Sequence, residues 1–303
     1  MVVIKQDKRN IIRTPVPRKV FLVFNYLILT LLFLISLFPF VNVLAVSLSE
    51  STAAHMVTFF PRDFTFSSYR FLIDRPEFFR AFGISVARVA LGTPLAMAVM
   101  ILMAYPLSLK GKVFFGKKIY VAMCIIAMFF SGGLIPTFQV ISGLGMLDTI
   151  WALVLPGAMN VWSMILLLNF FRRVPDDLIE YASIEGAGHI RKLWHIVIPL
   201  SIPAIATVAI LTAIFHWNAW FDGLIYMSAR NLPLQTYIYN VLQELQNIFI
   251  QGVTPEDAHI IARLGDESLR AAQVFIAMIP IMLIYPFAQR FFVKGMMLGS
   301  VKE

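Results

Sequence analysis

The chain has 303 residues, of which 59% are hydrophobic and 14% are charged, and its formal net charge is +8. About a quarter of the residues of a soluble domain are charged, so this composition excludes an ordinary soluble protein. The excess of positive charge does not indicate a nucleic-acid-binding protein, because the basic residues gather in short segments between apolar runs.

Six apolar segments are each long enough to cross a bilayer as an α-helix, which needs about 20 residues. They lack the alternation of barrel strands, so we expect an all-α membrane protein with six transmembrane helices. The first segment is too long for the core of a signal peptide and has no small-residue cleavage site, so we predict that it is retained. The predicted spans lie near residues 20–46, 82–109, 119–141, 150–171, 197–221 and 272–293.

The basic residues predict which ends of the spans face the cytoplasm. Residues 1–19 hold six basic side chains against one acidic one, and the 110–118 loop holds four lysines and no acid. Short basic loops stay in the cytoplasm. We therefore predict that both termini, the 110–118 loop and the 172–196 loop are cytoplasmic, and that the loops 47–81, 142–149 and 226–270 are external.

Each predicted span contains proline, and glycines interrupt the third and fourth in "SGGLIP" (131–136) and "LPGAMN" (155–160). Broken helices are tolerated in lipid where neighbouring helices or a cavity pair the backbone again. Such breaks are typical of transporters, although simple bundles also bend. The single cysteine, Cys124, lies in the third span, and we interpret it as a buried packing residue.

Polar side chains inside the spans are costly and usually face a cavity or a partner. Two interpretations of "HWNAWFD" (216–222) stay open: an interfacial belt made by its tryptophans, or the lining of a pathway. The arginine of the second span can line the same pathway or extend to the outer surface, and the asparagines of the fourth can also bond between helices. The candidate pathway residues are Arg88, Asn160, Asn169, His216, Asn218 and Asp222.

No catalytic or metal-binding motif is recognisable. "GKVFFGKK" (111–118) has the glycine spacing of a phosphate-binding loop, but Lys118 stands where serine or threonine is required and no strand precedes it. We therefore predict that the chain is not an enzyme and binds no metal or cofactor itself.

Residues 172–199 predict a short charged hairpin between two spans. Pro175 suits the first helical turn, and Gly186 and Gly188 can end that helix in a left-handed turn. In the second arm, Ile190, Leu193, Trp194 and Val197 are expected on one side, and Arg191 and Lys192 on the other. Such a hairpin either docks a cytoplasmic partner or only caps the bundle.

The same residues carry a family resemblance. Glu180, Ala182, Gly186, Ile196 and Pro199 stand at the spacing of the E-A-A-x3-G-x9-I-x-L-P signature of binding-protein-dependent ABC importer permeases, with Tyr181 and Ile198 departing from it. "HWNAWFDGLIY" and the tail "QRFFVKGMMLGSVKE" also resemble the carbohydrate branch of this family. The resemblance covers residues 20–303 and is closest to the LplC/YtcP-like group.

The resemblance implies a type I ABC importer permease fold in a bacterial cytoplasmic membrane. The hairpin is then the coupling helix, which docks into a cytoplasmic ATPase that uses ATP and Mg. The implied partners are a homologous permease subunit, two ATPase subunits and an extracytoplasmic solute-binding protein that meets the 226–270 loop. The residues expected at the ATPase are Glu180, Tyr181, Ala182, Gly186, Ala187, Ile196 and Pro199.

The resemblance thus implies a channel-forming subunit of an ATP-driven importer for a sugar, an oligosaccharide or a polysaccharide fragment. The alternative is a secondary transporter driven by an ion gradient, which predicts paired intramembrane carboxylates or repeated broken helices. Neither pattern is evident in the sequence. A weaker alternative is a membrane scaffold that only binds a cytoplasmic partner.

Overall fold

The computed structural model describes residues 16–50, 54–109, 116–251 and 267–297. Within these ranges the regular structure is helical, apart from one bridge between Ser49 and Phe64. Most of the basic N-terminal segment, the centre of the 110–118 loop and residues 252–266 of the predicted external loop lie outside the described residues.

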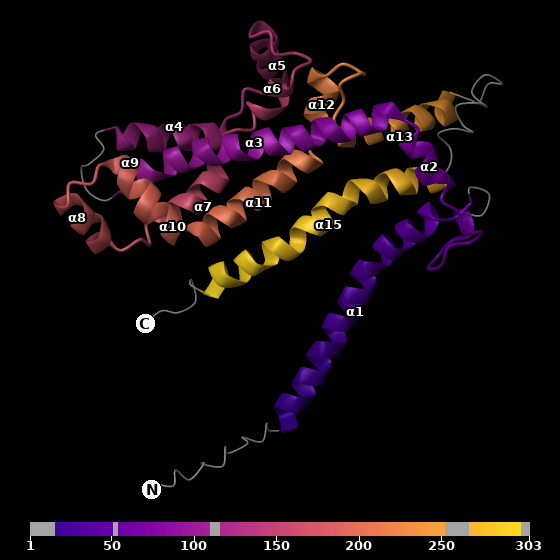
Figure 1. Cartoon of the computed structure of the whole chain (residues 1–303), viewed down its shortest axis with the longest axis horizontal. Helices are drawn as coiled ribbons and strands as arrows, with labels where there is room; N and C mark the ends of the chain where they lie inside the picture. Colours follow the sequence, from indigo (N-terminus) through magenta and orange to yellow (C-terminus); the bar gives the residue numbers. More distant parts are fainter. Residues whose placement is uncertain (1–15, 51–53, 110–115, 252–266, 298–303) are drawn as a thin grey trace.

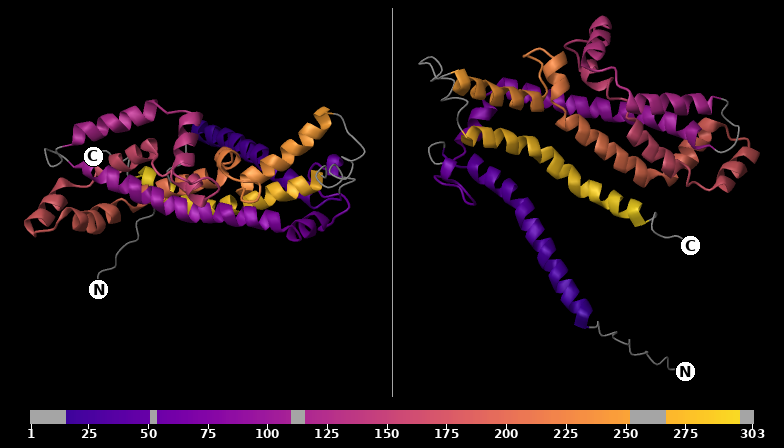
Figure 2. Two further views of the ribbon diagram at one scale, coloured as in Figure 1. Left: turned by 90° about the horizontal axis from the view of Figure 1, so that it is seen from above. Right: turned by 180° about the vertical axis from the view of Figure 1, so that it is seen from behind.

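A bundle of long helices forms the body of the molecule. Helices α3, α11 and α15 run side by side, and α7 packs against α3, α11 and α4 (Figure 1). Helix α1 meets α15 near one end and diverges from it toward its own N-terminus (Figure 2). The bounds are α1 (Val16–Ser47), α3 (Pro76–Ser108), α4 (Lys117–Phe129), α7 (Val161–Phe171), α11 (Ile202–Asn218) and α15 (Glu267–Met297).

The main core lies where α3, α7 and α11 meet. Met100, Leu167 and Val208 have no measurable exposed surface there. The small side chains of Ala96 and Ala104 are equally buried, and small residues allow membrane helices to approach closely. Cys124 of α4 is buried at the edge of the same cluster, in keeping with its interpretation as a packing residue.

Two predicted spans are broken at the glycines that the sequence marks. Helix α4 ends at Phe129, and α5 (Leu134–Gly143) leaves it at 115° through Gly133, whose φ of 81° is left-handed and favours glycine. The fourth predicted span consists of α6 (Ile150–Val154) and α7, which are separated by residues 155–160. The fifth bends by 84° between residues 189–200 and α11.

The helices are long and apolar enough for a membrane protein. Among the described residues, α1, α3 and the first 20 residues of α15 each qualify as a span, and counting each of two bent helix pairs as one span raises the number to five. The count of six spans stays a prediction, because α7 by itself has only 11 residues.

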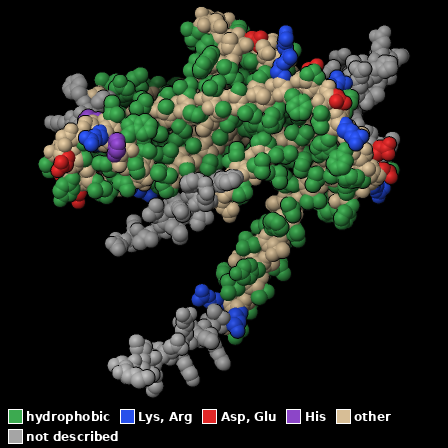
Figure 3. Space-filling model, in the orientation of Figure 1, with side chains coloured by type: hydrophobic (Ala, Val, Ile, Leu, Met, Phe, Trp, Pro, Cys, Tyr) green, Lys and Arg blue, Asp and Glu red, His purple; other side chains and the backbone are tan. Residues whose placement is uncertain are grey.

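Short elements lie at the two ends of the bundle. The charged hairpin occupies one end, and α2, α12 and α13 lie toward the other (Figure 1). In Figure 3 charged side chains lie at the ends of the bundle and on the projection that α5, α6 and α12 form at the top, whereas the rest of the visible flank is largely hydrophobic. The short elements are η1 (Ala54–Met56), α2 (Ser67–Ile73), α8 (Asp176–Ile184), α9 (His189–Lys192), η2 (Leu193–Val197), α10 (Ile198–Leu200), α12 (Phe221–Tyr226) and α13 (Leu234–Gln251).

Candidate functional site

Helix α8 is delimited by the residues that the sequence predicts. Pro175 stands immediately before it as the N-cap, and Asp176 and Asp177 occupy its first turn, where acids complement the helix dipole. At its other end Gly186 has a φ of 74°. The N–H of Gly186 donates to the carbonyl of Ser183 at 3.1 Å, and that of Ala187 donates to the carbonyl of Ala182 at 2.8 Å. These two bonds make a Schellman motif, which fixes where the helix stops.

A buried lysine ties the two arms of the hairpin together. Lys192 is 8% exposed, and its Nζ donates to Ser183 Oγ at 2.6 Å. Ser183 Oγ in turn donates to the carbonyl of Ile179 at 2.7 Å. The second arm also reaches the bundle, because His189 Nδ1 lies 3.3 Å from the hydroxyl of Tyr105 on α3.

The expected face of the second arm is wrong in part. Leu193 and Val197 are buried, but Ile190 and Trp194 are 76% and 62% exposed. The arm turns the side that carries Lys192, Leu193 and Val197 toward α8 and the bundle, so Ile190 and Trp194 face outward. Lys192, expected on the polar side, points inward to Ser183. Gly188 has a φ of −68°, so Gly186 alone makes the left-handed turn.

The outer surface of the hairpin exposes apolar side chains beside acidic ones. Tyr181 and Ile184 of α8 are 69% and 81% exposed, and no residue of α8 is buried. A cavity of about 500 Å³ lies between the hairpin and the adjoining ends of α3 and α7. Of the seven residues expected at the ATPase, Glu180, Tyr181, Gly186 and Pro199 are exposed and Ala182, Ala187 and Ile196 are half-buried.

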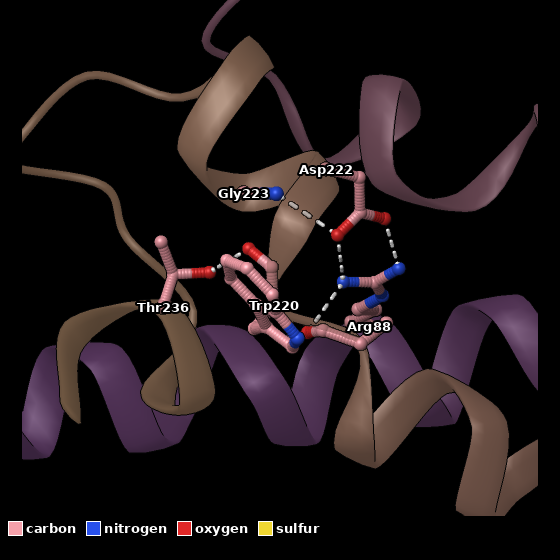
Figure 4. Close-up of polar contacts among 6 residues, drawn as sticks. Arg88, Trp220, Asp222, Gly223 and Thr236 are labelled. Carbon is pink, nitrogen blue, oxygen red and sulfur yellow. Dashed lines mark hydrogen bonds and ion pairs between the residues drawn. The ribbon is translucent and has the colours of Figure 1, made fainter. Parts of the chain in front are cut away.

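The second candidate region lies toward the opposite end of the bundle, where Arg88 of α3 meets the break between α11 and α12. The side chain of Arg88 is 1% exposed and forms a bidentate ion pair with Asp222, with Nη1 to Oδ1 at 3.0 Å (Figure 4). Nη1 also donates to the carbonyl of Ala219 at 3.3 Å, and the N–H of Gly223 donates to Asp222 Oδ1 at 2.9 Å. The interpretation in which Arg88 extends to the outer surface is therefore wrong, because its charge is neutralised inside the protein.

His216 packs into a space left by two glycines. It is 1% exposed, and a Cβ at Gly92 of α3 would lie 2.7 Å from its Nε2. A Cβ at Gly157, in the break between α6 and α7, would lie 3.6 Å from its Cε1. The histidine thus joins three elements, and both of its ring nitrogens are buried without a hydrogen-bond partner.

The three candidate asparagines do not join this group. Asn160 caps α7, where its Oδ1 accepts from the N–H of Ser163 at 2.9 Å. Asn218 Nδ2 donates to the carbonyl of Ile214 within its own helix at 3.0 Å. Asn169 is exposed on α7. The six candidate pathway residues therefore separate into one cluster, Arg88 with His216 and Asp222, and three residues outside it.

The structure adds contacts that the sequence did not reveal. Thr236 Oγ1 of α13 donates to the carbonyl of Trp220 at 2.6 Å (Figure 4), and the ring of Trp220 stacks on Tyr239 at 4.3 Å between centroids. Trp217 is 5% exposed and its Nε1 donates to the carbonyl of Ala277 at 3.0 Å, so it is a core residue and not part of an interfacial belt. Helix α13 is thereby bonded to the break between α11 and α12 at which Arg88 binds Asp222.

A single aspartate joins two of the predicted external loops. The carboxylate of Asp148 accepts from the N–H of Ser228 at 2.9 Å and from Asn231 Nδ2 at 3.0 Å, and its own N–H donates to the carbonyl of Tyr226 at 2.9 Å. The bond from the backbone of Ser228 lowers the pKa of this carboxyl group, because it stabilises the ionised form. The α5–α6 turn and the α12–α13 loop are thus held together.

Comparison with known proteins identifies a family and two similar proteins. A family described as "Binding-protein-dependent transport system inner membrane component" matches residues 80–298. Protein LplC of Bacillus subtilis (strain 168) is 36% identical over 287 residues, which cover 94% of this chain and 95% of that protein. The polygalacturonan/rhamnogalacturonan transport system permease protein YtcP of the same organism is 34% identical over 272 residues, covering 89% and 93%.

One solved structure is similar over almost the whole chain. It is a chain from the crystal structure of a bacterial ABC transporter involved in the import of the acidic polysaccharide alginate. The TM-score is 0.80 at 26% sequence identity, and the match covers 92% of this chain and 99% of that chain.

Proposed function

Because this chain belongs to the family of binding-protein-dependent transport system inner membrane components, we propose that it forms half of a solute channel that a separate ATPase opens and closes. The observation that carries the proposal is the hairpin 172–199, whose short helix α8 ends in a Schellman motif, whose second arm is bonded to α3, and whose outer surface exposes Tyr181 and Ile184. Membership in this family favours the energy-coupled importer over the gradient-driven secondary transporter.

The contacts of the hairpin would transmit a displacement of α8 to the helix bundle. Lys192 joins α8 to the second arm, and the pair Tyr105–His189 joins that arm to α3. Tyr105 and Arg88 are 17 residues apart on α3, which corresponds to about 25 Å along a helix. A push on α8 would therefore reach the pair Arg88–Asp222 through α3 and through α11, if these elements move as rigid bodies.

In this proposal the cluster of Arg88, His216 and Asp222 stabilises the external end of the solute channel. Arg88, His216 and Asp222 join α3, α11 and α12, and Thr236 joins α13 to the same break. The guanidinium of Arg88 is already occupied by a carboxylate, so it would support the shape of the pathway and not bind an anionic solute directly. We assign α13 and the loops around it to the contact with a solute-binding protein.

The proposed partners are a homologous permease subunit, two cytoplasmic ATPase subunits that bind ATP and Mg, and an extracytoplasmic solute-binding protein. We propose that the hairpin and both termini face the cytoplasm of a bacterial cell. The helix directions support one common side, because α3 ends beside the hairpin and α11 begins there, while α15 starts beside α2 at the other end, where Ser68 Oγ and Ser268 Oγ lie 2.9 Å apart. The basic residues of segments 1–19 and 110–118 predict that this side is the cytoplasm.

We propose a fragment of an acidic polysaccharide as the solute. Two of the similar proteins carry such substrates in their names, a polygalacturonan/rhamnogalacturonan permease and an alginate importer. Oligogalacturonate is therefore the first probe to test, with an uncharged maltooligosaccharide of the same length as the comparison.

The coupling role is tested with the assembled complex in vesicles. Ala182→Lys places a charge on the half-buried side of α8, and Ala182→Ser is the matched control, because it adds one atom and no charge at the same position. We expect Ala182→Lys to abolish ATP-dependent uptake of oligogalacturonate while the complex still assembles in the membrane, and Ala182→Ser to retain uptake. Normal uptake by Ala182→Lys would contradict the proposal.

A further inference from the structure

The segment after α1 turns back along that helix and is held in place by several hydrogen bonds. Asn42 of α1 donates from Nδ2 to the carbonyls of Val57 and Thr58, at 3.2 and 3.0 Å. The ring of Phe59 meets the ring of Phe38 of α1 edge-on, with 5.1 Å between centroids. These contacts fix the tip of the turn, residues 57–61, beside the part of α1 between Phe38 and Asn42.

The chain segments on either side of the tip are also hydrogen-bonded to each other. The N–H of Thr65 donates to the carbonyl of Leu48 at 2.9 Å, and the N–H of Arg62 donates to Ser49 Oγ at 3.0 Å. The N–H of Glu50 donates to the carbonyls of Arg62 and Asp63. The turn is therefore a defined feature of the fold.

The tip exposes large apolar side chains. Phe60 is 83% exposed and Phe59 is 53% exposed, and Phe64 on the returning strand is 60% exposed. Exposed apolar surface of this kind marks a contact with a partner or a membrane. The residues that follow Pro61 are charged, since Arg62 and Asp63 are both exposed. Two exposed phenylalanines, Phe59 and Phe60, followed after Pro61 by two charged residues match the layering of a membrane–water interface.

The position of Phe38 on α1 gives the depth of the tip. Lys19 is the last charged residue before the apolar run of α1. The 19 residues from Lys19 to Phe38 span about 28 Å of helix, close to the roughly 30 Å thickness of the hydrocarbon core. If Lys19 lies at one boundary of the core, Phe38 and the ring of Phe59 lie at the other, at the depth where interfacial segments bury phenylalanine side chains.

We propose that the turn at 57–61 is a lipid anchor whose phenylalanines insert into the outer boundary of the bilayer. Phe59 and Phe60 continue the exposed apolar surface of α1, and Arg62 lies within reach of lipid phosphates. Asn42 pairs the carbonyls of Val57 and Thr58, which would otherwise be costly to bring near hydrocarbon. The anchor sets the height of the outer end of α1 in the membrane.

The single cysteine of the chain makes a direct test possible. Cys124→Ala removes it, and Phe60→Cys then carries a nitroxide spin label in the complex, reconstituted in vesicles of phosphatidylcholine and phosphatidylglycerol. Accessibility to oxygen, which concentrates in lipid, is compared with accessibility to a water-soluble nickel chelate. Phe33→Cys on the exposed middle of α1 is the lipid reference, and Asp63→Cys is the aqueous reference.

The expected result is a ratio of oxygen to nickel accessibility at position 60 that is several-fold above the ratio at position 63 and below that at position 33. A ratio equal to that at position 63 would mean that the tip lies in water. Low accessibility to both reagents would mean that another protein subunit covers it. Either of these results would overturn the proposal.

Discussion

The contact between Gly92 and His216 gives the sharpest prediction, because one methyl group tests the packing of α3 against α11. In Gly92→Ala the new Cβ would lie 2.7 Å from His216 Nε2 and 2.8 Å from Cε1. The distance to Nε2 is 0.7 Å shorter than the 3.4 Å at which ordinary van der Waals contact begins. The ring cannot move far, because it is 1% exposed and borders Gly157 on another element.

Overpacking of this kind costs about 1–3 kcal/mol of stability. At roughly 2–4 °C per kcal/mol for domains of 150–250 residues, Gly92→Ala should lower the unfolding temperature by about 2–12 °C. Gly83→Ala is the matched control in the same helix, because a Cβ there meets no atom within 4 Å. It should leave the unfolding temperature unchanged or raise it slightly, since alanine favours a helix over glycine.

The assay is the unfolding temperature of the detergent-solubilised complex, followed by size-exclusion chromatography after heating. The same Gly92→Ala change is then made together with His216→Ala, which removes the ring. We expect Gly92→Ala to be neutral or stabilising in that second background, because the methyl group now fills part of the space. Equal losses in both backgrounds, or equal temperatures for Gly92→Ala and Gly83→Ala, would refute the packing argument.

Three further predictions concern the hairpin, the ion pair and the external loops. Gly186→Ala should destabilise the end of α8 by about 1 kcal/mol, because alanine is strained at a φ of 74°. It should also reduce uptake in vesicles. Gly188→Ala is the control and should leave uptake unchanged, because Gly188 has a φ of −68°. Arg88→Met should lower the free energy of unfolding by about 3 kcal/mol, because it leaves the carboxylate of Asp222 without its partner. This value is the lower end of the range for a broken buried ion pair, since Asp222 is 27% exposed. Adding Asp222→Asn should restore part of the unfolding temperature that Arg88→Met loses. Since the pKa of Asp148 is lowered, the bonds of its carboxylate to the α12–α13 loop should be complete above the ordinary carboxyl pKa of about 4 and weaken as the pH falls through the lowered value. The distance distribution between spin labels on the two loops should therefore broaden only in acid, and at every pH in Asp148→Ala, which removes both acceptor oxygens.

Much of the fold follows from local sequence signals. The all-helical class, the breaks at 131–136 and 155–160, and the bounds of α8 each depend on glycine, proline or apolar runs that act within a few residues. Asn160 also carried a local signal, because an asparagine directly before an apolar run is a typical N-cap. We assigned it to the pathway or to contacts between helices, whereas it caps α7.

The arrangement around Arg88 could not be predicted in the same way. Arg88 and Asp222 are separated by 134 residues, and nothing local says which way each helix turns its side chains. The close approach of Gly92 to His216 is likewise a property of two helices packed together. In the hairpin, the side that the second arm turns toward α8 carries Lys192, and the polar pattern of that arm cannot anticipate this.

The separation of α1 from the rest of the bundle has a consequence for biogenesis. Its main contact within the described residues is with α15, and Ser268 at the start of that helix donates from Oγ to the carbonyl of Ser49 at 2.6 Å. A ribosome makes α1 first and α15 last, so the first helix waits in the bilayer without its neighbour until translation is nearly complete. A chain cut short before residue 267 would therefore leave α1 without the helix that it packs against.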